Sequence, residues 1–151
     1  MRTGKVRAIG VSNFNAGEIK DLVDNTGELP EVNQIQYHPW SSPAWHAAVA
    51  AWAGQGVVVT AYNSLGGARF ATSDLTGSAV ARVAQERGIS VNSVLLAWAR
   101  SKGCAVIPGS STPAHIAENL QAMEQLTPSE VSRIDASAAP DGWWSPRGPN
   151  K

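Results

Sequence analysis

Four short apolar segments of this sequence each end in polar residues that could bind a ligand or take part in a reaction. Ser12 and Asn13 follow the first segment, and Gln34, Tyr62 and Ser110 stand at the ends of the next three. In barrels of alternating strands and helices, side chains at the carboxyl ends of the strands carry the chemistry. The pattern therefore predicts functional residues at four strand ends.

The last of these ends has the features of an anion site. Ser110, Ser111 and Thr112 come just before a helix that Pro113 is expected to open. The first N–H groups of a helix lack intrahelical partners, and the helix dipole favours negative charge there. Ordinary capping by Thr112 is the simpler structural role, and it is compatible with phosphate binding.

Other reactive side chains form no recognisable catalytic arrangement. The three histidines lack the spacing of a metal site, and no Ser–His–Asp set can be assembled. Tyr37, His38 and Tyr62 remain acid–base candidates only because they lie near strand ends. A structural role is favoured for His38, and a surface or packing role for His46. The single cysteine, Cys104, is interpreted as a small buried hydrophobe.

Composition narrows the class of protein. The 151 residues are 43% hydrophobic and carry 12 basic and 12 acidic side chains, so one sizeable core is expected and nucleic acid is not an expected partner. No apolar run approaches the ~20 residues of a membrane-spanning helix. The first ten residues lack the features of a signal peptide. A cytoplasmic protein without a membrane partner or a bound metal is expected.

Strand and helix patterns alternate along the chain. Apolar or β-branched runs predict strands at 6–11, 32–36, 57–62 and 104–107, the first of them covered on both faces. Helices are expected to start near Asn15, Ser42, Ser90, Pro113 and Thr127, with one more around Val80. Residues 66–77 are expected to form a loop. Alternation of this kind indicates a parallel sheet.

Two architectures contain such a sheet. No GxGxxG fingerprint follows a strand, which argues against a dinucleotide-binding Rossmann unit. Polar residues at all four strand ends favour a barrel. A closed barrel needs about eight strand–helix units and roughly 250 residues, so the fold expected is an α/β half-barrel with four parallel strands and flanking helices.

Four segments in order resemble the aldo-keto reductases: GKVRAIGVSNF, VNQIQYHP, VVVTAYNSLG and VIPGSSTPAHIAENL. The resemblance runs from about Thr3 to Ala136. It implies the C-terminal, cofactor-binding half of a (β/α)8 TIM barrel, with residues 1–139 supplying strands five to eight and residues 140–151 forming a tail. It also implies an oxidoreductase that reduces carbonyls with NAD(P)H. The family's catalytic tyrosine, lysine, aspartate and histidine belong to the first four strands, so no catalytic residue is assigned here.

The resemblance also implies cofactor contacts. Ser12 and Asn13 would hold the nicotinamide carboxamide with Gln34 beside them, although Gln34 could equally be a satisfied interior amide. Tyr62 would stack on the nicotinamide. The remaining implied contacts are a loop over the pyrophosphate (Asn63, Ser64, Leu65, Gly66), a phosphate site (Gly109, Ser110, Ser111, Thr112, His115) and two residues at the adenine (Glu118, Asn119).

Two of these positions differ from the family pattern. Gly109 stands where the family commonly has lysine, and His115 stands where it commonly has arginine. Those cations bind the 2′-phosphate that distinguishes NADP from NAD. The cofactor expected is therefore NAD(P)H with a relaxed preference or a preference for NAD.

A half-barrel leaves two sheet edges and one apolar face open, which invites association. The chain is therefore expected to pair with a copy of itself or with a separate N-terminal half-barrel, or to be a truncated fragment of a longer protein. A non-catalytic module that binds a nucleotide or a partner is the alternative function. The sequence does not identify the substrate or a role for Trp143 and Trp144.

Overall fold

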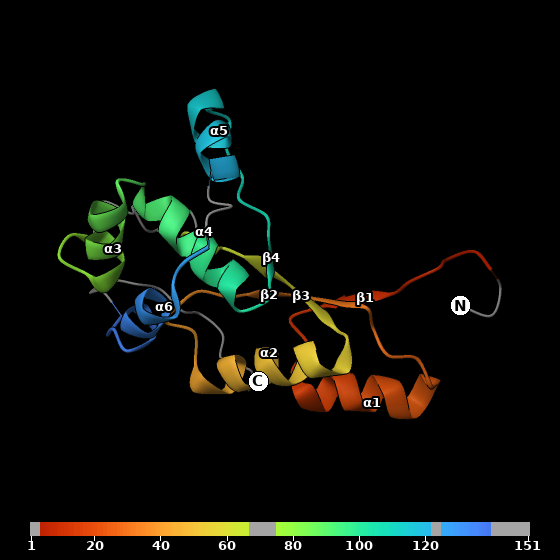
Figure 1. Ribbon diagram of the computed structural model, residues 1–151. Coiled ribbons are helices and arrows are strands. Elements are labelled where there is room, and N and C mark those ends of the chain that lie inside the picture. The colour runs from red at the N-terminus through yellow and green to blue at the C-terminus, as the bar shows by residue number, and fades with distance from the viewer. Residues whose placement is uncertain (1–3, 67–74, 122–124, 140–151) are drawn as a thin grey trace.

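The computed structural model describes residues 4–66, 75–121 and 125–139 (Figure 1). Within them a four-stranded parallel sheet has the order β1-β2-β3-β4. The strands are β1 (Gly10–Ser12), β2 (Val32–Gln36), β3 (Val58–Tyr62) and β4 (Ala105–Val106). The helices are α1 (Ala16–Thr26), α2 (Pro43–Gln55), α3 (Ala79–Arg87), α4 (Val91–Ser101), α5 (Pro113–Gln121) and α6 (Pro128–Asp135). The alternation predicted from the sequence is confirmed.

Local signals set most helix ends. Asn15 and Glu18 form the predicted capping box, each side chain accepting the other residue's backbone N–H, and Gly27 ends α1 at a φ of 71°. Thr127 and Glu130 form a second capping box at the start of α6. These hydrogen bonds lie within a few residues of the chain, which is why the sequence predicts them without knowledge of the fold.

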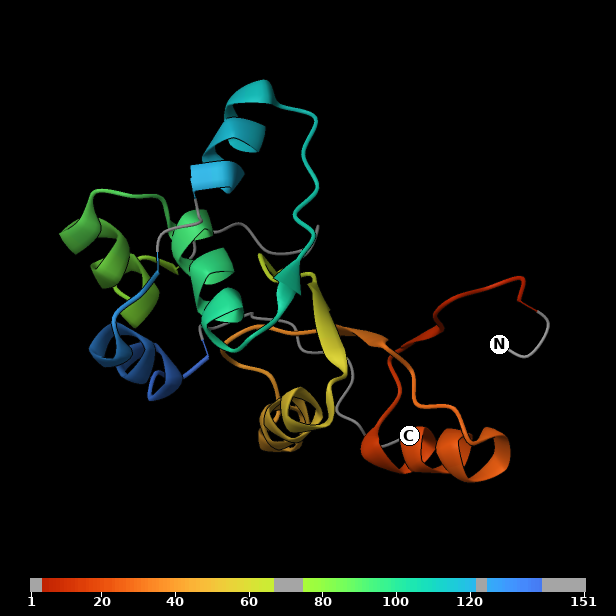
Figure 2. The same ribbon diagram turned by 45° about the vertical axis from the view of Figure 1, so that its right-hand side comes forward.

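Helices cover only one face of the sheet. Ile35, Tyr37, Val59 and Ala61 point to this face and are each at most 3% exposed. Both views place α1 and α2 on the same side of β1–β3 (Figure 2). The residues that alternate with these along each strand lie on the other face of the sheet, which we call the open face. Val58, with 49% of its surface exposed, is one of them.

The open face explains why the first predicted strand is wrong in extent. A strand over 6–11, covered on both faces, was expected, but β1 begins at Gly10, and Val6 and Ala8 are exposed. Only β2 pairs with β1, and nothing described covers its second face. Apolar residues are therefore present where the strand has no neighbour to pack against.

The last strand is also shorter than expected. It contains two residues instead of the predicted 104–107, and it pairs only with β3. Cys104 is buried as predicted, but Ile107 is 51% exposed. Both edge strands of the sheet are thus shorter than the apolar segments from which they were predicted.

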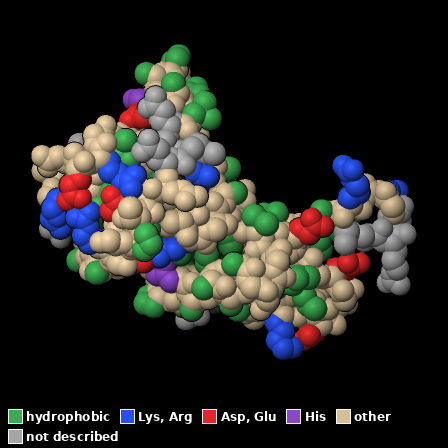
Figure 3. All heavy atoms as spheres, viewed as in Figure 1, with side chains coloured by type: hydrophobic (Ala, Val, Ile, Leu, Met, Phe, Trp, Pro, Cys, Tyr) green, Lys and Arg blue, Asp and Glu red, His purple; other side chains and the backbone are tan. Residues whose placement is uncertain are grey.

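The helices α4 and α6 close the other end of the core. Trp98 of α4 is fully buried, and its indole N–H donates to Asp135 Oδ1 at 2.7 Å. Arg87 makes a two-point ion pair with Glu130, at 2.6 and 2.7 Å, between α3 and α6. The charged side chains that gather on this side of the molecule are visible at the left of Figure 3.

Candidate functional site

A chain of hydrogen bonds joins the carboxyl ends of three strands. The Tyr62 hydroxyl, at the end of β3, donates to Asn13 Oδ1 at 3.0 Å. Asn13 Nδ2 donates to Ser12 Oγ at 3.2 Å, and Ser12 Oγ donates to the Gln34 carbonyl at 3.1 Å. Two of these bonds join residues that are 22 and 49 positions apart in the sequence. The four residues, all predicted from the sequence, are called the strand-end group: Ser12, Asn13, Gln34 and Tyr62.

Backbone geometry fixes the position of Asn13. Its φ is 59°, in the left-handed region that asparagine adopts more readily than most residues. Its N–H donates to the Gln34 carbonyl at 2.9 Å, which continues the pairing of β1 with β2 by one residue. The chain can then turn within two residues from β1 into the capping box of α1.

The strand-end group retains unused hydrogen-bonding capacity. Asn13 keeps one amide N–H and one carbonyl lone pair after the bonds described above. A primary carboxamide needs one donor and one acceptor placed side by side, so the residues present fit such a group. The Gln34 side chain is exposed on the open face, where it is accessible to a ligand, and its contact with a cofactor stays a prediction.

The segment after β3 folds as a tight turn. Asn63 has a φ of 52°, and its carbonyl accepts the N–H of Gly66 at 2.9 Å. Ser64 is buried, with its hydroxyl directed to the Ala61 carbonyl at 3.4 Å, and Leu65 is half-buried. Ser64 thus braces the turn, and its predicted contact with a cofactor remains a prediction, as does that of Gly66.

The predicted phosphate site is separate from the strand-end group. Gly109, Ser111 and Thr112 are exposed between β4 and α5, and the Thr112 N–H donates to Ser110 Oγ at 3.1 Å. His115, Glu118 and Asn119 lie on α5, which packs against α4 and projects away from the sheet (Figure 1). In the described residues no hydrogen bond joins this segment to the strand-end group.

Two acid–base candidates are excluded from the open face. Tyr37 is 1% exposed on the helix-covered side, where its hydroxyl lies 2.9 Å from His46 Nδ1, and burial raises its pKa. His38 is fully buried, and burial lowers its pKa to about 4. His46 packs edge-on to Trp98, as its predicted packing role requires. These side chains support the core and cannot reach the strand-end group.

One polar residue of interest was not singled out from the sequence. Asn33 of β2 is fully buried on the helix-covered side, and its Nδ2 donates to the Phe14 carbonyl at 2.8 Å. Asn33 belongs to the alternating set of residues in and just after β2 that also includes Ile35 and Tyr37. A polar residue within this otherwise apolar set is the signal that could have identified it.

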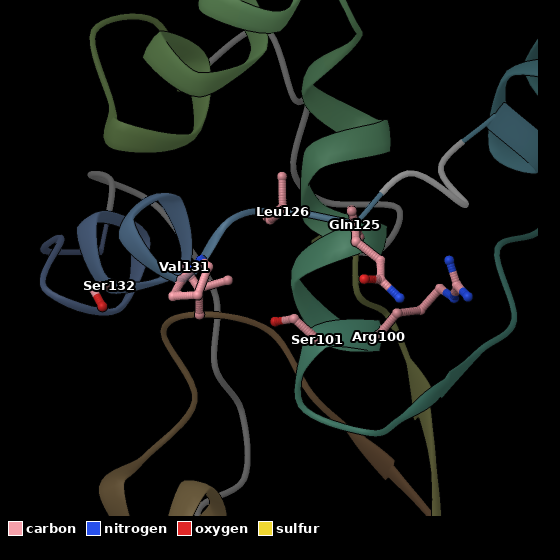
Figure 4. Close-up of a pocket in the computed structure, with 8 residues that line it drawn as sticks. Arg100, Ser101, Gln125, Leu126, Val131 and Ser132 are labelled. Carbon is pink, nitrogen blue, oxygen red and sulfur yellow. The ribbon is translucent and has the colours of Figure 1, made fainter.

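A cavity of about 560 Å³ lies elsewhere, between α4 and the start of α6 (Figure 4). Arg100, Ser101 and Gln125 supply its polar lining, and Leu126 and Val131 part of its apolar lining. None of the cofactor residues expected from the sequence borders it. Among the described residues there is also no cluster of potential metal ligands, and no helix there has the length and apolar character needed to cross a membrane.

Comparisons with known proteins agree with this architecture. The model of the "Aldo/keto reductase family" matches residues 1–139. An aldo-keto reductase from Mycobacterium sp. (strain MCS) is 37% identical over 133 residues, which are 87% of this chain and 45% of that protein. The aldose reductase structure from Giardia lamblia superposes with a TM-score of 0.74 at 34% identity, covering 89% of this chain and 45% of the other.

A third relative was solved with a cofactor. The Bombyx mori aldo-keto reductase in complex with NADP is 32% identical and has a TM-score of 0.73, covering 89% of this chain and 45% of that chain. The four parallel strands and their helices thus match part of a (β/α)8 barrel, and the chain spans about half the length of these relatives. This chain belongs to the aldo/keto reductase family of NADP-binding oxidoreductases.

Proposed function

We propose that this chain is the C-terminal, cofactor-binding half of an NAD(P)H-dependent carbonyl reductase, with β1 to β4 as strands five to eight of the barrel. The observation that carries the proposal is the strand-end group, in which Asn13 offers one donor and one acceptor beside the ring of Tyr62. This set is complementary to a nicotinamide, because a carboxamide and an aromatic ring are the two features that the group can bind.

Each residue has a distinct task in this proposal. Ser12 and Asn13 orient the carboxamide, and the exposed side chain of Gln34 adds a further amide beside them. Tyr62 stacks on the ring and selects the face presented to the substrate. Just before α5, the hydroxyls of Ser110 and Thr112 bind the phosphate of the adenosine end, and the Thr112 N–H holds Ser110 Oγ in place by donating to it.

The bound cofactor supplies the hydride for carbonyl reduction. Of the three acid–base candidates, Tyr37 and His38 are buried on the other side of the sheet, and the Tyr62 hydroxyl already donates to Asn13 Oδ1. General-acid help typically contributes about 10²–10⁴-fold to such a step. The isolated chain is therefore expected to bind cofactor but to reduce a simple aldehyde negligibly.

Cofactor preference in this proposal depends on two positions. Gly109 and the exposed His115 stand where a lysine and an arginine would grip a 2′-phosphate. Hydrogen bonds to ionised groups contribute roughly 1.5–3 kcal/mol each, so their loss removes most of the basis for preferring NADP. The chain is expected to bind NAD at least about as well as NADP.

Calorimetric titration with NADPH and NADH tests the proposal. Asn13→Leu is expected to weaken binding of both cofactors about tenfold or more, because both amide contacts are lost. Asn25→Leu is the matched control, since Asn25 is an exposed amide on α1 and bonds only to Asp21 in its own helix. Absence of binding to a cooperatively folded chain, or equal effects of the two variants, would refute the cofactor assignment.

The open face favours a second, non-exclusive function as a surface that binds a partner. Val58 and Ile107 are about half exposed, at 49% and 51%, and no strand of the described residues pairs with the outer edges of β1 and β4. We infer that this face binds a complementary half-barrel, which fits the half-length match to the relatives. Sedimentation at micromolar concentration is expected to show association or an expanded chain. A second copy as partner would appear as a dimer, and a compact monomer that unfolds cooperatively would contradict the inference.

A further inference from the structure

Ser12 ends β1 and Asn13 begins the link from β1 to α1, and one buried side chain holds this link from behind. Asn33 is 0% exposed and donates from Nδ2 to the carbonyl of Phe14 at 2.8 Å. Phe14 is the residue between Asn13 and the N-cap Asn15. Two other bonds on this link, from Ser12 Oγ and the Asn13 N–H to Gln34, are exposed to solvent. Asn33 thus supplies the protected bond.

The other half of the same amide is unsatisfied. Asn33 Oδ1 is buried and has no hydrogen-bond partner. A buried polar atom without a partner destabilises a fold. An apolar residue in this position, like its neighbours Val11 and Val59 in the sheet register, would avoid that cost. The stability of the core therefore does not account for an asparagine here.

We propose that Asn33 is a positioning residue that fixes the orientation of Asn13 toward the nicotinamide carboxamide. The proposal rests on the cofactor function proposed above. Asn33 does not touch the ligand; it anchors the Phe14 carbonyl, and the anchored peptide keeps Asn13 in its left-handed conformation. In that conformation the Asn13 amide is held by Tyr62 on one side and by Ser12 on the other.

A substitution separates positioning from stability. Asn33→Leu removes the bond to Phe14 together with the unsatisfied oxygen, so the unfolding midpoint is expected to stay the same or rise. Affinity for NAD⁺ is expected to fall about fivefold to tenfold, which corresponds to about 1–1.4 kcal/mol. Affinity for ADP-ribose, which lacks the nicotinamide, is expected to remain unchanged. A general loss of folded structure would weaken both ligands equally.

Two further variants complete the test. Asn92→Leu is the matched control: Asn92 also has an unsatisfied buried Oδ1, but it lies on α4, which packs on α3, α5 and β4. It should leave both affinities unchanged. In Asn33→Asp, a protonated carboxyl can still donate to Phe14, whereas a carboxylate repels that carbonyl. Burial raises the pKa of such a carboxyl, so the affinity of this variant relative to the original chain should recover as pH falls.

The outcomes distinguish this inference from the proposed function. If the original chain binds neither NAD⁺ nor ADP-ribose, the cofactor function is wrong. If the original chain binds NAD⁺ and Asn33→Leu binds it equally well, or loses ADP-ribose to the same extent, the positioning role of Asn33 is wrong and the cofactor function stands.

Discussion

The Tyr62 hydroxyl donates to Asn13 Oδ1 across a separation of 49 residues, at a distance of 3.0 Å. The bond spans β2, because β3 and β1 lie on its two sides in the sheet. A tyrosine to which the family resemblance assigns stacking on the nicotinamide therefore also holds the amide beside it. The position of Asn13 also depends on β2, because the Gln34 carbonyl accepts hydrogen bonds from the Asn13 N–H and the Ser12 hydroxyl.

Removing this hydroxyl should weaken cofactor binding modestly. In Tyr62→Phe the ring remains but Asn13 loses one of its two anchors, so affinity for NAD⁺ is expected to fall about fivefold. Tyr62→Ala should lose more, because the stacking surface is gone. Tyr37→Phe provides the control, since its hydroxyl bonds to His46 within the core and its loss should lower stability without changing affinity. Calorimetric titration of the three variants with NAD⁺ measures these affinities. Equal affinities of Tyr62→Phe and the original chain for NAD⁺ would contradict the role of the Tyr62 hydroxyl in holding Asn13 for the cofactor.

Restoring two cations should create a preference for NADP. A side chain at Gly109 would meet nothing within 4 Å, and this glycine does not have a positive φ, so lysine fits there without strain. Gly109→Lys combined with His115→Arg is expected to strengthen NADP⁺ binding by about tenfold or more, with little change for NAD⁺. The gain should shrink as salt rises, because it is electrostatic.

A control for charge alone is available on α2. Gly54 is equally open and lies near the end of α2, just before the amino end of β3, so Gly54→Lys adds a cation away from the strand carboxyl ends that carry the proposed cofactor site. It should leave both affinities unchanged. If the unmodified chain already binds NADP⁺ more than about tenfold tighter than NAD⁺, our interpretation of positions 109 and 115 is wrong.

Acid should destabilise the fold through His38. Its pKa is lowered from 6.5 to about 4 because burial disfavours the charged ring, so protonation favours the unfolded chain. The free energy of unfolding should be highest above pH 6.5 and should fall, by at most about 1.4 kcal/mol per pH unit, down to pH 4. Burial also lowers the pKa of His46, which adds a slope of the same sign. Urea titrations across this range should show a smaller dependence of the free energy of unfolding on pH for His38→Gln than for the original chain.

The single thiol should resist modification until the chain unfolds. Burial raises the pKa of Cys104 from 9.0 to about 12, which lowers the thiolate fraction near neutral pH by about a thousandfold. A disulfide reagent at about pH 8 should therefore react slowly with the folded chain and rapidly in urea. Rapid, complete reaction of the folded chain would show that the end of the core beside β4 opens easily.

Local sequence signals predicted the helix ends well, and the apolar runs predicted the central strands β2 and β3 closely, whereas the predicted edge strands β1 and β4 were too long. Asn15, Gly27 and Thr127 act through hydrogen bonds within their own turns, so their positions could be read from the sequence. The extent of β1 could not, because the run from Ala8 to Val11 has the composition of a covered strand and lacks the neighbours that would cover it.

The same distinction applies to the candidate site. The residues of the strand-end group were identified from the sequence by their places at strand ends, but the hydrogen bonds that connect them were not, since Tyr62 and Asn13 meet only through the sheet. Asn33 was missed because its partner is a backbone carbonyl 19 residues away, and its one signal in the sequence is a polar residue in the alternation that carries Ile35 and Tyr37. The core contacts among Tyr37, His46 and Trp98 likewise arise from packing between distant helices and strands.

The placement of α5 has a consequence for the thermodynamics of the proposed cofactor site. The start of α5 is connected to the sheet through exposed residues 109–112, which follow β4, and by the contact of α5 with α4; β4 pairs with β3, the strand that carries Tyr62. A dinucleotide that engages both ends therefore behaves as a bivalent ligand, and its second contact is governed by an effective concentration set by that connection. Shortening or stiffening residues 109–112 would change the affinity for the whole dinucleotide. The affinity of the strand-end group for the nicotinamide part, and of the start of α5 for the adenosine phosphate part, would each stay the same.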